Sequence, residues 1–383
     1  MSAAGGPQAT VRLRIGTLEV RCRGDADVLE RAMGPLRALA IDGEELPTLP
    51  AGASAVQVEV HGSAAVPRAH GEAGRAAQPT RYETDGGEPV IVAPGLGEAV
   101  LRTSGVVEVR LLPDAPEGDA LAERLTIPAL AERLRREGVR LVHGAILRAP
   151  HGRSALLVPA ARGGGKTTLS LSLARHGFTV LSDDRGWLGG PADAAWIDAW
   201  PEAPRVGDRS LFLLPSGLAS GPRDARTGKA VVPGLTPPRL ASPLAVGAVA
   251  LPRLVEGPGG AWRTVHGAAA LAPLLSQCVV ATDPRSAADT MRFVAALLAA
   301  RPAFEVEVGD DPASLAAASA DLTARTRPGA ESARERAEAG RLALEHVGEE
   351  LVVDGAHGAK SVRGGRFTDE LGQPRRVEAA QRR

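Results

Sequence analysis

The sequence predicts an α/β protein in three parts: a small, strand-rich α+β domain in residues 1–115, a larger α/β domain with a mixed sheet in residues 116–325, and a charged tail in residues 326–383. Short alternating apolar runs separated by Gly and Pro indicate the first part. A continuous apolar strand, a glycine-rich stretch and a helical pattern in succession indicate the second. Mixed charge with few large apolar residues predicts a loose helix plus disorder in the third.

The chain is balanced in charge. Its 383 residues include 45 basic and 45 acidic side chains, so the net charge favours neither nucleic acid nor an anionic membrane as a partner. Cys22 and Cys278 lack the spacing of a zinc site, and we expect them to be buried small hydrophobes in a reducing compartment. No signal peptide or membrane-length apolar run is recognisable, which predicts a cytoplasmic protein.

The first domain is expected to start with a hairpin and a helix. Residues 11–23 alternate apolar and polar side chains about a Gly-Thr turn, and residues 25–40 have helical spacing. Apolar runs between Gly and Pro predict further strands in residues 54–62, 88–94 and 106–113.

The second domain is expected to open with one or two helices that close at Gly138. The apolar runs that follow predict strands in residues 139–149, 154–160, 178–184, 244–255 and 304–308, and the spacing of apolar residues predicts a helix in residues 286–300. The segment from about 213 to 240 is rich in Pro and Gly and is expected to be a long loop.

Residues 160–167, "AARGGGKT", nearly match the phosphate-binding pattern G-x-x-x-x-G-K-[ST], with Ala160 in place of the first glycine. In such a loop the backbone N–H groups and the positive end of the next helix surround phosphate. Lys166 is expected to reach the β and γ phosphates, and Thr167 to ligate Mg²⁺. The alternative is a flexible loop in a glycine-rich protein. The candidate nucleotide-binding residues are Arg162, Gly163, Gly164, Gly165, Lys166, Thr167 and Thr168.

Two carboxylates, Asp183 and Asp184, end the apolar strand that follows this loop and its helix. In an open parallel sheet such a strand ends at the edge where ligands bind, beside the phosphate loop. Adjacent side chains at a strand end diverge, so one carboxylate can accept a proton from a hydroxyl while the other holds a metal. Taken alone, Ser-Asp-Asp is better explained as a solvated turn or a helix cap, and its distance from the glycine-rich loop favours the functional interpretation.

These residues carry a family likeness. The stretch "ARGGGKTTLSLSLARHGFTVLSDDR" resembles the nucleotide-binding core of HPr kinase/phosphorylase and its relatives, a P-loop class that shares its fold with phosphoenolpyruvate carboxykinase. The pair His143-Gly144 on the preceding strand adds to the likeness, which covers about residues 130–190 and fades toward 310. The family's Glu-x-Arg-Gly signature is absent, although Glu202, Arg205 and Arg209 lie at a loosely comparable place. The chain is similar to divergent HPr-kinase-related proteins.

The resemblance implies catalytic roles for three residues. Lys166 would bind the nucleotide phosphates, Asp183 would be the general base for the acceptor hydroxyl, and His143 would lie near the phosphates and the acceptor. Thr167 and Asp184 would hold the metal. Without the resemblance, His143 is better explained as a core histidine, because apolar residues share its strand face.

The resulting hypothesis is an ATP-dependent kinase that uses Mg²⁺ and ATP, or another nucleoside triphosphate, to phosphorylate a hydroxyl, with serine in a peptide or protein as the expected acceptor. Maturation of a peptide natural product is one setting for such an enzyme, and a homo-oligomer is left open. The alternative is a non-catalytic nucleotide-binding module that presents or regulates a partner peptide or protein. A transporter-type ATPase is disfavoured because no LSGGQ-like signature is present.

Two weaker features have open interpretations. Trp187, Trp196 and Trp200 lie close together in the sequence and either wall a pocket or pack in the core, with the core favoured. Lys229 lies in the Pro- and Gly-rich segment and either approaches the site or is an ordinary loop lysine.

Overall fold

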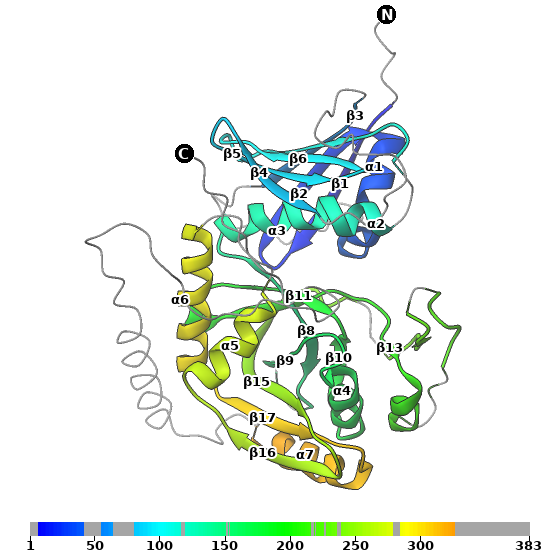
Figure 1. Ribbon diagram of the computed structural model, residues 1–383, viewed down its shortest axis with the longest axis vertical. Coiled ribbons are helices and arrows are strands. Elements are labelled where there is room, and N and C mark those ends of the chain that lie inside the picture. Colours follow the sequence, from blue (N-terminus) through cyan, green and yellow to red (C-terminus); the bar gives the residue numbers. More distant parts are fainter. Residues whose placement is uncertain are drawn as a thin grey trace, which may run out of the picture. The chain divides into compact units, whose positions relative to one another are not determined.

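The computed structural model describes residues 7–41, 55–63, 80–115, 119–150, 152, 154–215, 218, 220–225, 227–235, 239–278 and 284–325. The chain divides into two compact units, Met1–Val347 and Gly348–Arg383, and every described residue belongs to the first. The expected tail, residues 326–383, lies outside the described residues. Helices and two large mixed sheets in the described part confirm the α/β class (Figure 1).

The first sheet has the strand order β1-β2-β3-β7-β6-β5-β4. β2, β3 and β7 pair in parallel, and the other neighbours pair antiparallel. The expected hairpin is present as β1 and β2, joined at Gly16, whose φ of 59° suits glycine. The strands are β1 (Gln8–Ile15), β2 (Leu18–Asp25), β3 (Val56–Gly62), β4 (Arg81–Asp85), β5 (Glu88–Ala93), β6 (Gly97–Leu101) and β7 (Val107–Leu111).

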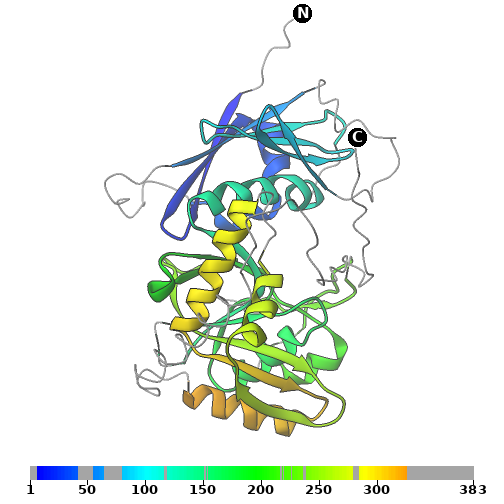
Figure 2. The same cartoon turned by 60° about the vertical axis from the view of Figure 1, so that its left-hand side comes forward.

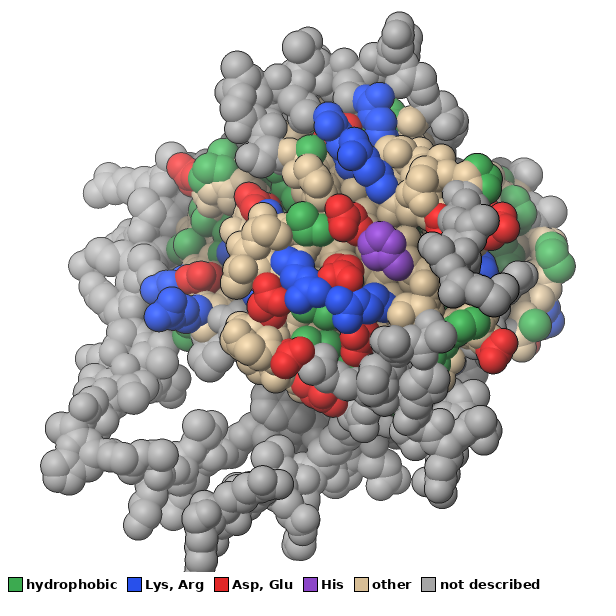
Figure 3. Space-filling model, turned by 90° about the horizontal axis from the view of Figure 1, so that it is seen from above, with side chains coloured by type: hydrophobic (Ala, Val, Ile, Leu, Met, Phe, Trp, Pro, Cys, Tyr) green, Lys and Arg blue, Asp and Glu red, His purple; other side chains and the backbone are tan. Residues whose placement is uncertain are grey.

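Helices cover one face of this sheet (Figures 1 and 2). They are α1 (Ala26–Met33), the 3-10 helix η1 (Gly34–Leu39), α2 (Asp119–Leu121), the π-helical turn η2 (Ala122–Thr126) and α3 (Ile127–Arg136). Alternation along β3 and β7 turns valines to these helices and polar residues to the other side. That side carries interspersed arginines and carboxylates (Figure 3), among them the ion-paired Arg12, Glu19, Arg21, Glu88, Arg102, Glu108 and Arg110.

The second sheet has the order β10-β8-β11-β12-β15-β17-β16, and β9 pairs with β15 and β8. It is mixed, as the sequence predicts: β15 is parallel to β9 and β17, and β8 is antiparallel to its partners. The strands are β8 (Arg140–Arg148), β9 (Ser154–Pro159), β10 (Thr179–Ser182), β11 (Arg185–Gly189), β12 (Trp196–Ala199), β15 (Leu244–Leu254), β16 (Gly259–Thr264) and β17 (Ala303–Val308). A separate pair joins β13 (Arg205–Val206) and β14 (Ala230–Val231).

Helices cover both faces of the second sheet, and this explains why β9 is apolar throughout. Leu156 and Val158 pack in one core with α4 (Lys166–Arg175) and α7 (Pro312–Arg325). Ala155 and Leu157 pack in the opposite core with α5 (Ala268–Ser276) and α6 (Pro284–Ala300). The central strand that leads into the glycine-rich stretch is therefore fixed from both sides.

Side chains on both sides of residue 115 share one core. Trp187 and Trp200, on and just after strands of the second sheet, are fully buried among side chains of the first sheet and its helices, with ring centroids 6.1 Å apart. Core packing is thus the role of these two tryptophans. Cys22 and Cys278 are buried free thiols, as expected. No helix in the described ranges is both long and apolar enough to cross a membrane.

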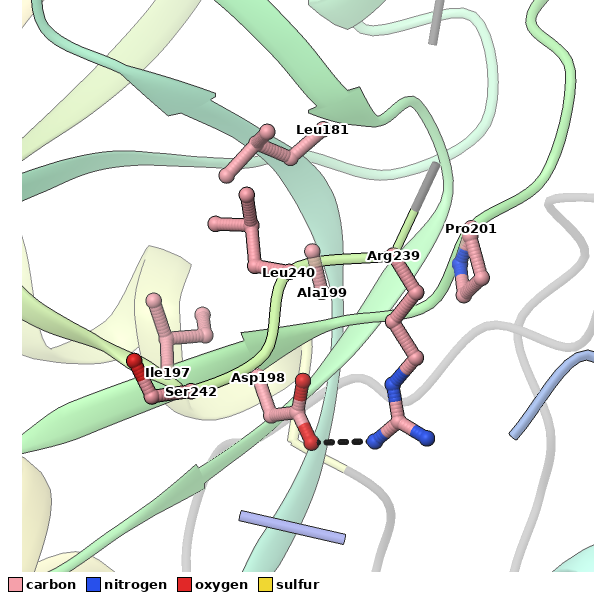
Figure 4. A pocket seen from close by; sticks show the side chains of 8 residues that line it. All are labelled: Leu181, Ile197, Asp198, Ala199, Pro201, Arg239, Leu240 and Ser242. Carbon is pink, nitrogen blue, oxygen red and sulfur yellow. Dashed lines mark hydrogen bonds and ion pairs between the residues drawn. The ribbon is translucent and has the colours of Figure 1, made fainter. Parts of the chain in front are cut away.

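A buried ion pair also joins the first hairpin to the second sheet. Asp198 of β12 is 3% exposed and accepts a hydrogen bond from the backbone N–H of Gly16, at 2.8 Å. It also accepts one from Arg239, at 2.5 Å (Figure 4). Arg239 also donates to the carbonyl oxygens of Leu39 and Arg14. The hairpin turn and η1 are therefore tied to the strand that leads toward Trp200.

Candidate functional site

The glycine-rich turn between β9 and α4 has the backbone conformation that the motif requires. Gly163 and Gly165 have φ values of 79° and 90°, which side chains other than glycine rarely adopt. A Cβ at Gly163 would meet no atom within 4 Å, so the turn is open at that point. Ala160 lies just after the end of β9, and Arg162 is exposed. The helix begins at Lys166, so its unpaired N–H groups face the turn.

The side chain of Lys166 folds back over this turn. It is 8% exposed, and its Nζ donates to the carbonyl oxygens of Ala160 at 2.6 Å and Ala161 at 3.3 Å. Nζ also lies 3.0 Å from Nε2 of His143 on β8. Burial lowers the pKa of Lys166 and the nearby Lys229 acts in the same direction, whereas the carboxylates of Asp184 and Asp183 raise it. An anion bound at the turn would add a further opposite charge beside this ammonium group.

Asp183 reaches the same place because of strand direction. β8 is antiparallel to both β9 and β10, so β9 and β10 run the same way and end at one edge of the sheet. There Thr167 donates its hydroxyl to Oδ2 of Asp183 at 3.1 Å. The other carboxylate oxygen, Oδ1, is buried and has no hydrogen-bond partner among the described residues. Burial raises the pKa of Asp183 to about 7, which makes it a proton acceptor at neutral pH.

His143 lies between Lys166 and the second carboxylate. Its Nδ1 is 3.4 Å from Oδ1 of Asp184, and its Nε2 is the atom that faces Lys166. Burial lowers the pKa of His143, and the positive charges of Lys166 and Arg185 act in the same direction, whereas the carboxylate of Asp184 raises it. The imidazole thus contacts both a lysine and a carboxylate, so the explanation as a core histidine is incomplete.

An ion network that the sequence did not reveal adjoins Asp184. The guanidinium of Arg185 forms a two-bond pair with Glu123, at 2.6 and 2.9 Å, and contacts Glu202 at 3.1 Å. Its Nε is 3.7 Å from Oδ2 of Asp184. Arg185 also lies 4.7 Å above the ring of Trp200, a cation–π contact. This side chain is therefore held from several sides.

The network continues into the Pro- and Gly-rich segment. Arg205 pairs with Glu202 at 3.4 Å and with Asp224 at 3.0 Å. Glu202 and Arg205 are two of the residues noted in the sequence in place of the family signature, and the structure joins them to Arg185. Glu123 comes from η2, 62 residues before Arg185, and no local pattern marked it.

The predicted nucleotide-binding residues are brought together only in part. Lys166 and Thr167 adjoin the carboxylates, and Lys229 is near enough to influence the pKa of both Lys166 and Asp183. Thr168 instead pairs with Ser210, at 2.9 Å, on the 3-10 helix η4 (Asp208–Leu213).

The residues present suit a magnesium–nucleotide complex. The start of α4 offers N–H groups to phosphate, and the unpartnered oxygen of Asp183 lies beside the Thr167 hydroxyl. The structure pairs Thr167 with Asp183, whereas Asp184 faces His143 and Arg185. In the described ranges no group of three or more His, Cys, Asp or Glu side chains could enclose a metal. Mg²⁺ in nucleotide sites commonly uses one or two protein carboxylates, together with phosphate and water.

Comparison with known proteins gives a weak structural likeness. No protein-family model matches the chain, and no curated protein does. Among solved structures, the Hpr(Ser) kinase/phosphatase from Coxiella burnetii is similar at 13% sequence identity, with 48% of this chain and 95% of that chain covered and a TM-score of 0.25. The family likeness seen in the motifs therefore stays a resemblance.

Proposed function

We propose that the protein is a phosphotransferase that moves the γ-phosphoryl group of magnesium-bound ATP, or of another nucleoside triphosphate, to a hydroxyl group. The observation that carries this proposal is the meeting of Lys166 and Thr167, at the start of α4, with Asp183 at the same sheet edge. A serine of a peptide or protein is the proposed acceptor, and a cytoplasmic setting belongs to the same proposal.

The chain's own residues supply positioning, charge and a base. The turn and Lys166 hold the phosphates and stabilise the charge that develops on them. Asp183 accepts the proton of the acceptor hydroxyl as that oxygen bonds to the γ-phosphorus and the bond to the β-phosphate oxygen breaks, which leaves the nucleoside diphosphate. Bound Mg²⁺ would neutralise phosphate oxygens, and Thr167 and Asp184 are the residues proposed to hold it.

A non-catalytic nucleotide-binding module is the second candidate. The bonds from Lys166 to the carbonyl oxygens of Ala160 and Ala161 favour it, because they hold the lysine away from open solvent. Nucleotide binding would then release Lys166 from these carbonyl oxygens, and a partner would sense this change without any reaction being catalysed.

A transfer assay with γ-labelled ATP separates the two candidates. The acceptors to test are the small peptides encoded beside this gene, a general protein substrate and small hydroxyl compounds. Label on an acceptor hydroxyl, dependent on Mg²⁺, supports the phosphotransferase. Tight nucleotide binding with no labelled acceptor supports the module.

A further inference from the structure

Leu254 is an exposed apolar side chain beside the glycine-rich turn. It is the last residue of β15 and is 57% exposed, although Leu251 on the same strand is buried. A Cβ built on Gly165 would lie 3.2 Å from Cδ2 of Leu254, so this leucine lies against the last residue of the turn before α4. Single exposed leucines are ordinary on protein surfaces. What distinguishes this one is its position against the turn that is proposed to hold phosphate.

The direction and length of the strands bring Leu254 to this turn. β15 is parallel to β9 and to β17, so the carboxyl ends of the three strands meet at one edge of the sheet. Val249 of β15 pairs with Leu157 of β9, and β9 ends soon afterwards at Pro159, whereas β15 continues to Leu254. The end of β15 therefore lies beyond the end of β9, at the level of the turn.

Leu254 faces the same side of the sheet as α4. It pairs in register with Val308 of β17, which is 3% exposed and belongs to the core that contains side chains of α4 and α7. Side chains alternate along a strand, so the neighbouring Arg253 points to the opposite face, where it pairs with Glu305 and Glu307. The surface that Leu254 presents beside the turn is therefore apolar and is separate from this ion cluster.

The backbone that carries Leu254 is held by close packing. The next residue, Val255, donates its N–H to the carbonyl oxygen of Val308 at 3.2 Å. A Cβ on Gly309 would lie 2.2 Å from the carbonyl oxygen of Gly257, so the turn after β15 and the turn after β17 leave no room for a side chain between them. The leucine is thus placed on a fixed part of the fold, as a residue that positions a ligand needs to be.

The reacting groups lie on the opposite flank of the glycine-rich turn. β9, which leads into the turn, pairs with β8 on one side and with β15 on the other. His143 is on β8 and Asp183 follows β10, whereas Leu254 ends β15. In the proposed reaction the γ-phosphate approaches Asp183, so the other end of a triphosphate that lies along the turn is on the side of β15. A nucleoside attached to that end would leave the turn beside Leu254.

We propose that Leu254 is the contact surface for the nucleoside of the bound nucleotide, with its exposed methyl groups against the ring of the base. This inference rests on the proposed function, because it requires a nucleoside triphosphate at the glycine-rich turn. A base that covers the leucine removes apolar surface from water and adds to the affinity that the phosphates supply. The contact therefore favours a nucleotide over a free triphosphate.

Calorimetric binding of ATP and of inorganic tripolyphosphate, each with Mg²⁺, tests this contact without requiring turnover. Leu254→Ser removes the apolar surface at an exposed position, and Leu254→Met keeps it. The ratio of the two affinities is the quantity to compare, because tripolyphosphate reports on the turn alone. In Leu254→Ser the preference for ATP should fall at least about fivefold, with tripolyphosphate binding unchanged, and Leu254→Met should keep the wild-type ratio.

Phe212→Ser is the matched control. Phe212 is a large apolar side chain, 52% exposed, on η4, and η4 contacts the start of α4 through Ser210 and Thr168. The affinity ratio should not change in Phe212→Ser. A fall of the ratio in that variant and not in Leu254→Ser would place the base on η4 and overturn the proposal. An equal loss of ATP and tripolyphosphate binding in Leu254→Ser would also overturn it, since Leu254 would then only shape the turn.

NMR of protein with ¹³C-labelled leucine methyl groups gives a direct readout. In a complex saturated with Mg²⁺ and a non-hydrolysable ATP analogue, the methyl signals that disappear in Leu254→Met should show contacts to base protons. Contacts of the base protons to other methyl groups and none to those of Leu254 would contradict the proposal.

The two proposals fail in different ways. Phosphoryl transfer by a protein whose preference for ATP does not depend on Leu254 keeps the phosphotransferase function and removes the nucleoside contact. A preference for ATP that depends on Leu254, without transfer to any acceptor, keeps the contact and removes the phosphotransferase function. No binding of ATP to the wild-type protein removes both.

Discussion

The ammonium group of Lys166 lies 3.0 Å from Nε2 of His143. Because an ammonium group only donates, Nε2 must be the nitrogen without a proton. The imidazole proton is then on Nδ1, which is 3.4 Å from Oδ1 of Asp184. One histidine thus lies between a lysine and a carboxylate, and its contact with the lysine sets its tautomer.

This linkage predicts a specific state of His143 in solution. We expect ¹⁵N NMR at pH 7.5 to show a neutral ring with the proton on Nδ1, and a titration midpoint below the ordinary value of 6.5 because burial lowers the pKa. Lys166→Met removes the donor and should allow both tautomers to be populated. A proton on Nε2 in the wild-type protein would contradict the described contact.

Lys166→Ala should lose both nucleotide binding and transfer. The substitution removes the charge that the turn holds for phosphate and leaves the carbonyl oxygens of Ala160 and Ala161 without this donor. We expect affinity for a fluorescent ATP analogue to fall by at least about a hundredfold, as for a charge-assisted contact of about 3 kcal/mol. Arg175→Ala is the control, since Arg175 is exposed in the last turn of α4, and the affinity of this variant should change much less.

Asp183→Asn should bind nucleotide but fail in transfer. The amide keeps the shape of the side chain and can still accept a hydrogen bond from Thr167, but it cannot take a proton from a hydroxyl. Loss of a general base typically lowers turnover by about 10²–10⁴-fold. The check is single-turnover transfer at saturating nucleotide. Turnover within about tenfold of wild type would exclude Asp183 as the base.

The raised pKa of Asp183 also predicts a pH dependence of stability. The folded-state pKa of about 7 lies above the ordinary value of 3.8, so the folded protein holds a proton that the unfolded chain releases between those values. The contribution of this group to stability is therefore full below about pH 4 and is lost as the pH rises through 7, by at most about 1.4 kcal/mol per pH unit.

Asp183→Asn removes this titration. The melting temperature of the variant relative to wild type, measured calorimetrically without nucleotide, should therefore increase from pH 5 to pH 8. A difference that does not change with pH would show that Asp183 does not titrate in this range. In transfer assays, wild-type turnover should rise with pH and level off above about 7.

Arg239→Ala should destabilise the protein by about 3–5 kcal/mol, the usual cost of leaving a buried charge without its partner. Asp198 would keep only the bond from the N–H of Gly16. Urea unfolding measures the change. Arg263→Ala is the control, because Arg263 pairs with Glu305 at an exposed position and its loss should cost less than about 1 kcal/mol. Equal effects of the two changes would contradict the importance of the buried pair.

Much of this fold could be predicted because its central strands are buried on one or both faces, and such strands have an alternating or a continuous run of apolar residues. The hairpin, α1, β8, β9 and α6 all follow from the spacing of apolar residues. The sequence did not predict α7, whose buried face alternates Leu315 and Leu322 with the small Ala318 and Ser319, or β16, which begins with two glycines. Small side chains contrast weakly with their neighbours, and glycine is common in loops, so these patterns were hidden.

The meeting of Lys166, Thr167 and Asp183 could also be predicted, because motif spacing and strand direction bring them to one edge. The pair between Arg185 and Glu123 could not. It joins a strand of the second sheet to a turn of the helical layer of the first, and such an ion pair depends on tertiary packing that no local sequence pattern encodes.

The burial of Trp187 and Trp200 against the first sheet limits how far the chain can be shortened from its N-terminal side. Trp187 and Trp200 fill space among side chains that come mostly from residues before 142. A shortened chain that begins after the first sheet would expose both indole rings to water and lose the turn that caps Asp198. We therefore expect the two sheets to melt in one cooperative transition, and a substitution that disrupts the first hairpin to destabilise the second sheet as well.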